Sequence, residues 1–368
     1  MKVIMTCGGT GGHIYPAIAI ADEIKRRKPD AEILFVGSEI GLEKDIVPEN
    51  GYEIKLVEAD GFNRQHLFRN IKVVRRLMKG TMQSRKILKE FKPDVVIGTG
   101  GYASAPIMKE AQRIGIPTYV HEQNAVPGMA NRVLEKKVEK LFLGFEEGSK
   151  YFKYPEKHVV AGNPVRKEFM NTSKEEARAA LGFKPSDFIL LAFGGSQGAG
   201  RVNKAMIRII ETFNGVKDFK VCLATGGYYY DAINKELQDK GVEVEENIKI
   251  MEYIYDMAKY LSACDIVISR SGALSVAEVT VCGKPAIFIP SPIVTGNHQY
   301  YNAKAVADKG GAFIVEEKDL DNDQLISTVL KLKNNSEILE RMSAKSAACA
   351  PLEATKIICD NILGREMQ

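Results

Sequence analysis

The feature that most constrains this sequence is a regular alternation of short apolar runs with amphipathic stretches along its whole length. The runs are rich in Val, Ile and Leu without a polar residue at every second position, which is typical of parallel strands buried on both faces. Helix-like stretches such as Ala17–Arg27, Asn203–Phe213 and Leu274–Cys282 separate them. The pattern predicts βαβ units and hence an α/β fold of doubly wound parallel sheets. The runs lie at Val3–Cys7, Glu32–Val36, Val95–Thr99, Thr118–His121, Lys140–Leu143, Ile189–Phe193, Lys220–Ala224, Ile266–Ser269 and Ala286–Ile289.

The same pattern restarts once, which indicates two domains. Residues 1–25 read as strand, Gly-Gly turn and helix, and residues 188–210 repeat that order. A length of 368 residues also suits two domains. We predict an N-terminal domain at 1–163 and a C-terminal domain at 164–351, joined near Pro164. Two Rossmann-like domains are expected to face a central cleft, because open α/β sheets bind ligands beyond the carboxyl ends of their strands.

Three glycine-rich loops each follow a predicted strand. Glycines let backbone N–H groups approach an anion, and the helix that follows presents its positive end to the same place. The first loop is not a dinucleotide fingerprint, because Ile14 stands where the last glycine belongs. Each loop alone also fits a plain tight turn, but three at strand ends predict a site for a diphosphate. They are Gly8-Gly9-Thr10-Gly11-Gly12-His13, Gly98-Thr99-Gly100-Gly101-Tyr102 and Gly194-Gly195-Ser196-Gln197-Gly198-Ala199.

Several polar side chains stand beside these loops. His13 lies at a predicted helix start, and histidine is the side chain best suited to take a proton near neutral pH. His121-Glu122-Gln123-Asn124 follows another strand, and Glu278 lies inside a helix that begins near Gly272-Ala273. Arg166 follows the junction and could neutralise a phosphate. Structural alternatives are open for all of them: a helix-start hydrogen bond, an exposed loop, a solvated glutamate and a surface arginine.

A basic stretch, residues 62–92, carries ten Lys and Arg residues against Glu90 alone. Leu67, Ile71, Val74 and Met78 recur in it at helical spacing. A basic amphipathic helix can lie on an anionic membrane surface. The alternative is that the apolar residues pack on the sheet while the cations face solvent. Nucleic acid is a weaker interpretation, because no binding module is recognisable and the net charge is only +4.

Composition limits the remaining classes of site. The six cysteines contain no C-x-x-C pair, which argues against a zinc or redox site and suggests reduced thiols in a cytosolic protein. The N-terminus resembles a core strand and not a signal peptide, and no apolar run approaches the ~20 residues of a membrane span. Asp321-Asn322-Asp323 resembles a metal motif of sugar transferases but fits a helix start better, and Glu39 would suit a dinucleotide ribose only with the full glycine fingerprint. We therefore expect no metal site and no cofactor.

These motifs resemble one protein family in their order, spacing and residue identity. Three further segments take part in the resemblance: Gly162-Asn163-Pro164-Val165-Arg166, Ser269–Glu278 and His298–Ala303. The family is that of undecaprenyldiphospho-muramoylpentapeptide N-acetylglucosaminyltransferases of bacterial peptidoglycan synthesis, and the resemblance covers nearly the whole chain. It implies the GT-B architecture, with the last helix, about Leu352–Leu363 within 352–368, returning to the first domain. It also implies a peripheral enzyme on the cytoplasmic side of the cell membrane.

The resemblance implies a role for individual residues. UDP-GlcNAc would be bound mainly by the second domain, with Glu278 on the ribose, the Ile254 backbone on uracil, and Ser196, Ala273 and Leu274 on the diphosphate. Gly11 and Gly12 are assigned to both substrates, because the acceptor diphosphate would also meet them beside Gly100, Gly101 and Tyr102. An acid often precedes His298 in such proteins, and Asn297 stands here. The full donor set is Thr10, Gly11, Gly12, Asn124, Arg166, Ser196, Gln197, Ile254, Ala273, Leu274, Glu278, His298 and Gln299.

The reaction implied is a single displacement with inversion and without a metal ion. The 4-hydroxyl of N-acetylmuramic acid in the lipid-linked muramoyl-pentapeptide would attack UDP-GlcNAc, with His13 as base and Glu122 in reserve. The alternatives are a related enzyme acting on diacylglycerol, a UDP-GlcNAc epimerase, a dinucleotide oxidoreductase and a sugar-nucleotide sensor without activity. Acceptor competition, consumption of donor alone and NAD(H) binding distinguish the first three.

Overall fold

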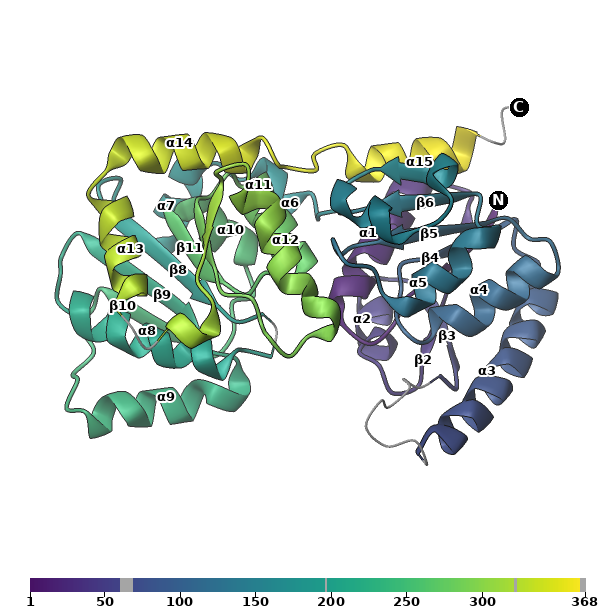
Figure 1. The fold of residues 1–368 in the computed structure, drawn as a ribbon, viewed down its shortest axis with the longest axis horizontal. Coiled ribbons are helices and arrows are strands. Elements are labelled where there is room, and N and C mark those ends of the chain that lie inside the picture. Colours follow the sequence, from purple (N-terminus) through teal and green to yellow (C-terminus); the bar gives the residue numbers. More distant parts are fainter. Residues whose placement is uncertain (60–68, 196, 321–322, 365–368) are drawn as a thin grey trace. The chain divides into compact units, whose positions relative to one another are not determined.

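A computed structural model describes residues 1–59, 69–195, 197–320 and 323–364, with the backbone alone at 69–74. The chain divides into two compact units (Figure 1). Unit 1 comprises Met1–Val165 and Leu352–Gln368, and unit 2 comprises Arg166–Pro351. The chain thus passes into unit 2 two residues after Pro164, where the sequence placed the junction.

Unit 1 is built on a seven-stranded sheet in the order β3-β2-β1-β4-β5-β6-β7, in which every paired strand is parallel. Side chains alternate across β1, so that Val3 and Met5 belong to one core and Ile4 to the other. The sheet is therefore covered on both faces, as apolar parallel strands require. Its strands are β1 (Lys2–Thr6), β2 (Glu32–Ser38), β3 (Glu53–Val57), β4 (Val95–Gly98), β5 (Thr118–Glu122), β6 (Lys140–Leu143) and β7 (His158–Val160).

The helices of unit 1 pack on these two cores. The helix α3 approaches the end of β3 closely, because a Cβ atom on Gly80 would lie 2.2 Å from the Glu58 carbonyl oxygen. The helices are α1 (Gly11–Arg27), α2 (Glu43–Glu49), α3 (Arg69–Phe91), α4 (Ser104–Arg113), α5 (Met129–Leu134) and α15 (Ala354–Leu363), with 3-10 turns η1 (Glu135–Lys137), η2 (Glu146–Tyr151) and η3 (Pro155–Lys157).

The last helix, α15, lies beside α1, which belongs to the opposite end of the sequence (Figure 1). Ile358, Cys359 and Ile362 are buried in the same core as Ile20 and Ile24. The Arg27 guanidinium donates to the Asp360 carboxylate at 2.5 Å at the edge of this contact. The core of unit 1 is consequently completed by residues that follow unit 2 in the sequence.

Unit 2 repeats the plan with six parallel strands in the order β10-β9-β8-β11-β12-β13. The strands are β8 (Phe188–Phe193), β9 (Phe219–Ala224), β10 (Ile248–Met251), β11 (Ile266–Ser269), β12 (Ala286–Phe288) and β13 (Ala312–Ile314). The helices are α6 (Glu168–Asn171), α7 (Lys174–Leu181), α8 (Gly200–Phe213), α9 (Gly227–Asp239), α10 (Met257–Ala263), α11 (Ala273–Val281), α12 (His298–Ala307), α13 (Gln324–Lys333) and α14 (Ser336–Ala347), with 3-10 turns η4 (Thr295–Asn297) and η5 (Glu317–Asp319).

The predicted α/β class with two doubly wound parallel sheets is confirmed. All nine predicted strands are present within two residues of their expected bounds, and the sheets contain four more: β3, β7, β10 and β13. These four are the edge strands, and they are only partly buried: charged residues interrupt β3 and β10, while β7 and β13 are only three residues long. The predicted helices Ala17–Arg27 and Asn203–Phe213 begin earlier, at Gly11 and Gly200, because the glycine loops continue directly into the first helical turn.

All six cysteines are free, and Cys7, Cys222, Cys264 and Cys359 are buried. Burial raises the pKa of the Cys222 and Cys264 thiols to about 12. These two side chains are therefore protonated and unreactive at neutral pH. Among the helices that the structure describes, none combines the length and apolar character needed to cross a bilayer.

Candidate active site

The first glycine loop connects β1 to α1 and is held from beneath by a carboxylate. Gly9, at φ +89°, donates its N–H to Glu43 Oε2 at 2.9 Å, and Ser38 donates its N–H to Glu43 Oε1 at 2.7 Å. Glu43 is fully buried on α2. Glu43 was not predicted as part of the site, because nothing near it in the sequence indicates a contact with a loop more than thirty residues away.

The start of α1 offers backbone donors for an anion. The first helical bonds reach the Thr10 carbonyl from His13 N at 3.0 Å and Ile14 N at 3.3 Å. Within the described part of the chain, the N–H groups of Gly11 and Gly12 have no recorded acceptor. Two donors at the positive end of a 17-residue helix suit a phosphate group.

His13, in the first turn of α1, is held through one ring nitrogen. Its Nδ1 lies 2.9 Å from the Thr99 carbonyl oxygen and 3.0 Å from Gln123 Oε1. Thr99 also donates its hydroxyl to the His13 carbonyl at 2.7 Å. A Cβ atom on Gly100 would come within 2.9 Å of Nδ1, so only glycine leaves room for the ring. The predicted loops at 8–13 and 98–102 are therefore brought together around His13.

The second glycine loop packs directly on the first. Gly101 has φ +87°, and a Cβ atom there would lie 2.3 Å from the Gly8 carbonyl oxygen. Gly100 has φ +104°, which L side chains rarely adopt. Tyr102 follows with 62% of its surface exposed. The tyrosine is therefore accessible to a ligand bound at this edge of the sheet.

The segment after β5 contains two buried side chains with different partners. Glu122 accepts hydrogen bonds on both carboxylate oxygens, from Asn124 N and Gly128 N at 3.0 Å each and from Asn131 Nδ2 at 2.8 Å. Gln123 contacts His13 instead. With its carboxylate occupied by the loop that follows, Glu122 suits holding that loop better than receiving a proton. Asn124 is half-buried in the same loop.

In unit 2, the third glycine loop connects β8 to α8. Gly198 has φ +74°, and a Cβ atom there would lie 2.0 Å from the Thr225 carbonyl oxygen, so the loop after β9 packs against it. Asn203 strengthens this contact by donating to the Thr225 carbonyl at 2.8 Å. Gln197 is exposed, and Ser196 lies outside the described residues.

The loop after β11 leads into α11 at Ala273. Val276 N donates to the Gly272 carbonyl at 2.9 Å, and the N–H groups of Ala273 and Leu274 precede the first helical bond. Glu278, one turn further along α11, has no recorded hydrogen-bond partner in the described part of the chain. These features place two backbone donors and one available carboxylate on the same helix.

The surroundings of Glu278 favour its neutral form. Burial raises the pKa of its carboxyl to about 7, while the Arg166 guanidinium lowers that pKa and the Glu168 carboxylate raises it further. Arg166 pairs with Glu168 at 2.8 Å and lies over the Phe169 ring at 5.0 Å from its centroid. Arg166 and Glu278, which were predicted separately, are therefore close enough for their charges to interact.

The remaining predicted donor residues follow β10 and β12. Ile254 is buried, and its backbone N–H and carbonyl have no recorded partner among the described residues. Gln299, on α12, accepts from Ser291 N at 2.9 Å. His298 Nδ1 lies 3.0 Å from the Thr295 carbonyl, and Asn297 before it adopts a left-handed φ of +51°, which asparagine tolerates better than most residues.

A cavity of about 540 Å³ lies at the carboxyl end of the unit 2 sheet. Its wall includes Asn297, just before α12, Tyr300 in the first turn of α12, and cations from two other elements. The lining residues are Arg201, Pro290, Pro292, Asn297, Tyr300, Glu316, Glu317 and Lys318. Among the described residues, none of the predicted donor residues lines this cavity, although the loops after β8, β10, β11 and β12 begin at the same sheet edge.

Two sequence features that resemble other kinds of site are Asp321-Asn322-Asp323 and Glu39. Asp323 precedes α13 and pairs with Arg208, while Asp321 and Asn322 lie outside the described residues. Glu39 is exposed after β2. Over the described ranges, no three His, Cys, Asp or Glu side chains are grouped so that they could hold a metal ion.

Comparison with known protein families matches both units. Residues 3–143 match the glycosyltransferase family 28 N-terminal domain, and residues 189–357 match the C-terminal domain of the same family. Two similar proteins are both called UDP-N-acetylglucosamine–N-acetylmuramyl-(pentapeptide) pyrophosphoryl-undecaprenol N-acetylglucosamine transferase. The one from Caldicellulosiruptor saccharolyticus is 44% identical, covering 97% of this chain and 96% of its own. The one from Clostridioides difficile is 44% identical, covering 99% of this chain and 88% of its own.

Solved structures give the same fold. The crystal structure of Acinetobacter baumannii MurG has a TM-score of 0.77 at 26% identity, covering 99% of both chains. A UDP-GlcNAc 2-epimerase from Neisseria meningitidis has a TM-score of 0.70 at 16% identity, covering 99% of this chain and 100% of its own. At that identity the second similarity shows the fold alone.

Proposed function

This chain belongs to glycosyltransferase family 28 and, with its full-length relatives, to the enzymes that transfer N-acetylglucosamine from UDP-GlcNAc to lipid-linked N-acetylmuramyl pentapeptide; we propose how its residues carry out that transfer. The observation that best supports the proposal is the hydrogen bonding of His13. Among the described residues its ring has partners through Nδ1 only, and it lies within one turn of two backbone N–H groups that have no acceptor there. This arrangement supports a base at His13 beside an anion site at Gly11 and Gly12.

The proposed step is an in-line displacement at the anomeric carbon. The 4-hydroxyl oxygen of N-acetylmuramic acid forms the new bond to that carbon, and the bond to the UDP oxygen breaks with its electron pair moving to UDP. The hydroxyl proton moves to His13 Nε2. Attack on the face opposite the leaving group inverts the configuration, so that an α-linked donor gives a β-linked disaccharide lipid and UDP.

Donor binding is assigned to unit 2. The N–H groups of Ala273 and Leu274, with the loop of Ser196 and Gln197, suit the diphosphate. The Ile254 backbone has both a donor and an acceptor for the uracil edge, and the Glu278 carboxylate can accept two bonds from the ribose diol. Gln299, His298 and Asn124 are proposed to contact the sugar.

Charge on the departing UDP is proposed to be stabilised by these backbone donors and by the Arg166 guanidinium, without a divalent metal ion. Acceptor binding is assigned to unit 1. The diphosphate of the lipid would meet Gly11 and Gly12, and the loop of Gly100, Gly101 and Tyr102 adds an exposed aromatic ring. Thr10, Gly11 and Gly12 are proposed to contact the donor as well.

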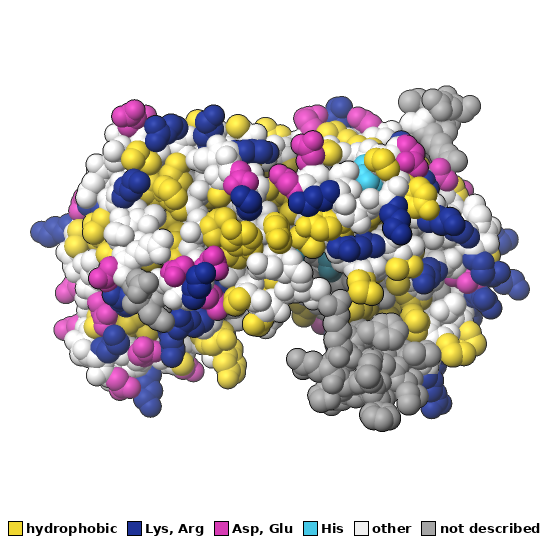
Figure 2. Space-filling model, viewed as in Figure 1, with side chains coloured by type: hydrophobic (Ala, Val, Ile, Leu, Met, Phe, Trp, Pro, Cys, Tyr) yellow, Lys and Arg dark blue, Asp and Glu magenta, His cyan; other side chains and the backbone are white. Residues whose placement is uncertain are grey.

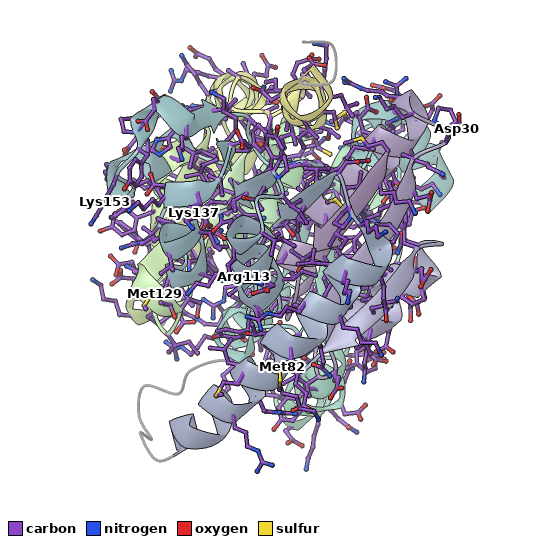
Figure 3. The ribbon with its side chains drawn as sticks, turned by 90° about the vertical axis from the view of Figure 1, so that its right-hand side faces the viewer. Asp30, Met82, Arg113, Met129, Lys137 and Lys153 are labelled. Carbon is purple, nitrogen blue, oxygen red and sulfur yellow. The ribbon has the colours of Figure 1, made fainter. Side chains whose placement is uncertain are left out.

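The acceptor is a lipid, and α3 supplies a surface that suits a membrane. Met78 and Met82 are 65% and 60% exposed, and Figure 3 shows Met82 at the surface of α3. They share a helix face with three cations, Arg75, Lys79 and Lys86, while the opposite face at Ile87 and Leu88 is buried. The predicted alternative that Met78 packs on the sheet is therefore wrong, whereas Leu67 lies outside the described residues and the side chains of Ile71 and Val74 are not described.

Figure 2 shows dark blue Lys and Arg side chains gathered on the side of unit 1 where α3 and α4 lie. Each cation near an anionic surface contributes about 1 kcal/mol to binding. We propose peripheral attachment to the inner leaflet from the cytoplasmic side, and no binding to nucleic acid. Flotation with vesicles containing anionic lipid tests this: Met78→Ser with Met82→Ser should lower the bound fraction. Ile293→Ser, which removes a 92% exposed side chain from unit 2, should not.

UDP release tests the reaction itself. The enzyme is incubated with UDP-GlcNAc in the presence of EDTA, with and without the muramoyl-pentapeptide diphosphate lipid. Release that requires the acceptor supports metal-independent transfer. Release without acceptor would indicate an epimerase or a hydrolase, and no release in either case would refute the proposed reaction or its independence of metal, which added Mg²⁺ distinguishes.

A further inference from the structure

Gln123 connects His13 to a second, buried histidine. The His121 ring is fully buried on β5, and its Nε2 lies 3.0 Å from the Gly162 carbonyl oxygen. Its Nδ1 lies 3.0 Å from Gln123 Nε2. Gln123, also buried, then contacts His13 through Oε1. The four groups form a continuous chain of hydrogen bonds inside unit 1.

The contacts determine which way the Gln123 amide faces. Gln123 Nε2 lies 2.7 Å from the Thr99 carbonyl oxygen, which can only accept a hydrogen bond. A rotated amide would put two oxygens in contact at that distance. The NH₂ group must therefore face Thr99 and His121, and the carbonyl oxygen must face His13.

The same reasoning determines the proton on each imidazole. The Gly162 carbonyl requires a proton on His121 Nε2, and the Gln123 amide requires a lone pair on His121 Nδ1. Burial lowers the pKa of His121 to about 4, in agreement with this neutral form. At His13, Nδ1 faces two acceptors, Thr99 O and Gln123 Oε1, and so it carries the proton. The lone pair of neutral His13 is consequently on Nε2.

We propose that Gln123 is a positioning residue that holds His13 in the Nδ1–H tautomer, so that Nε2 is the nitrogen that receives the hydroxyl proton. This inference rests on the proposed function for its catalytic meaning, but the tautomer does not depend on it. When Nε2 gains a proton, the positive ring donates from Nδ1 to two carbonyl oxygens. A carboxylate performs that role in a Ser-His-Asp triad, whereas here an amide and a peptide carbonyl share it.

Nitrogen-15 NMR of the full-length protein, labelled at its five histidines, tests the tautomer directly. The His13 signals are assigned by their loss in His13→Gln. Above the titration range of the ring, the proposal requires a protonated Nδ1 and an unprotonated Nε2 in the wild type. Protonation at Nε2 instead would overturn it, whether or not the protein transfers sugar.

Kinetics of Gln123→Met test the consequence. Methionine fills similar space but removes both the acceptor for His13 and the donor for His121. We expect kcat to fall about 10- to 100-fold, as for loss of a hydrogen bond to a group that becomes charged. Both KM values should change little, because the side chain is buried. Gln123→Glu keeps the size and the acceptor for His13, and as the protonated acid it can still donate to the Thr99 carbonyl, so it should retain more activity than the methionine variant and serves if that variant does not fold.

A double variant separates positioning from general support of the fold. In a His13→Gln background, Gln123→Met should lower kcat no further, since its effect acts through His13. Gln112→Met is the control, because Gln112 is a half-buried glutamine of unit 1 that donates to Thr118 Oγ1 at 3.2 Å and to the Leu134 carbonyl at 3.1 Å. An equal loss in the control, an additive loss in the double variant, or wild-type kcat in Gln123→Met would each overturn the proposal.

Discussion

The affinity for UDP-GlcNAc should depend on pH through Glu278. Its carboxyl has a pKa of about 7 because burial disfavours the charged form. Only the ionised carboxylate can accept a bond from each hydroxyl of the ribose diol. If binding requires that form, the apparent Kd exceeds its limiting value by a factor of about 11 at pH 6, about 2 at pH 7 and about 1.1 at pH 8. Affinity should therefore rise about tenfold between pH 6 and pH 8.

Titration calorimetry measures both the affinity and the protons exchanged, and it suits a chain without tryptophan. UDP-GlcNAc is the proper ligand, because its diphosphate is esterified at both ends and keeps its charge across this range. At pH 7, binding should release about half a proton per molecule, seen by comparing buffers of different ionisation enthalpy.

Two variants make this result specific to Glu278. Glu278→Gln should bind more than tenfold more weakly than the wild type at pH 8, remain weaker than the wild type at pH 6, and show no slope between them, since glutamine imitates the neutral acid. Glu168→Gln removes a charge that raises the Glu278 pKa, so its curve should keep the amplitude and move to lower pH. A flat profile in the wild type, or the same slope in Glu278→Gln, would refute the assignment.

Three further outcomes follow from other parts of the molecule. His13→Ala should lower kcat about 10²- to 10⁴-fold in the UDP-release assay, and near-normal turnover would remove His13 as the base. Glu23→Gln should lower the free energy of unfolding in urea by about 1 kcal/mol at pH 7, since two arginines bond to Glu23 and solvent screens part of the pairing. The hydrogen bond from Arg26, with a smaller effect of Arg27, lowers the pKa of Glu23 to about 2. The stabilisation is therefore complete above about pH 4.5 and should disappear as the pH falls toward 2. Lys284→Met should cost about 1–3 kcal/mol in the same measurement, because it leaves the Ser262 and Cys264 carbonyls without their buried donor, and an unchanged midpoint would contradict that role.

The sequence predicted the interior of both sheets but not their borders, for a physical reason. A strand with neighbours on both sides is covered by helices above and below, and its apolar run is visible without other information. The edge strand β3 contains Glu53 and Lys55, and β10 contains Lys249, because an edge is partly open to water. Such strands depend on pairing with a neighbour that is distant in sequence, which periodicity does not record.

The candidate site also contains a part that the sequence predicts and a part that it does not. Glycine loops and His13 are local signals at strand ends, and the structure brings the 8–13 and 98–102 loops together as expected. The supporting contacts are long-range: Gln123 meets His13 across 110 positions and Glu43 meets Gly9 across 34. Glu43 carries no motif of its own, and the polar segment His121–Asn124 indicates a strand end without showing that Gln123 is the residue that meets His13.

The place of α15 in the core of unit 1 sets an order of events during protein synthesis. Unit 2 is one continuous segment, whereas unit 1 needs residues from both before and after it. As the chain leaves the ribosome, residues 1–165 emerge first but leave the apolar surface of α1 around Ile20 and Ile24 without its cover. That surface stays open until Ile358 and Ile362 have been translated. Unit 1 is thus the first unit to be synthesised and the last to complete its core. A nascent chain arrested after unit 2 would expose the apolar face of α1, to which chaperones could bind.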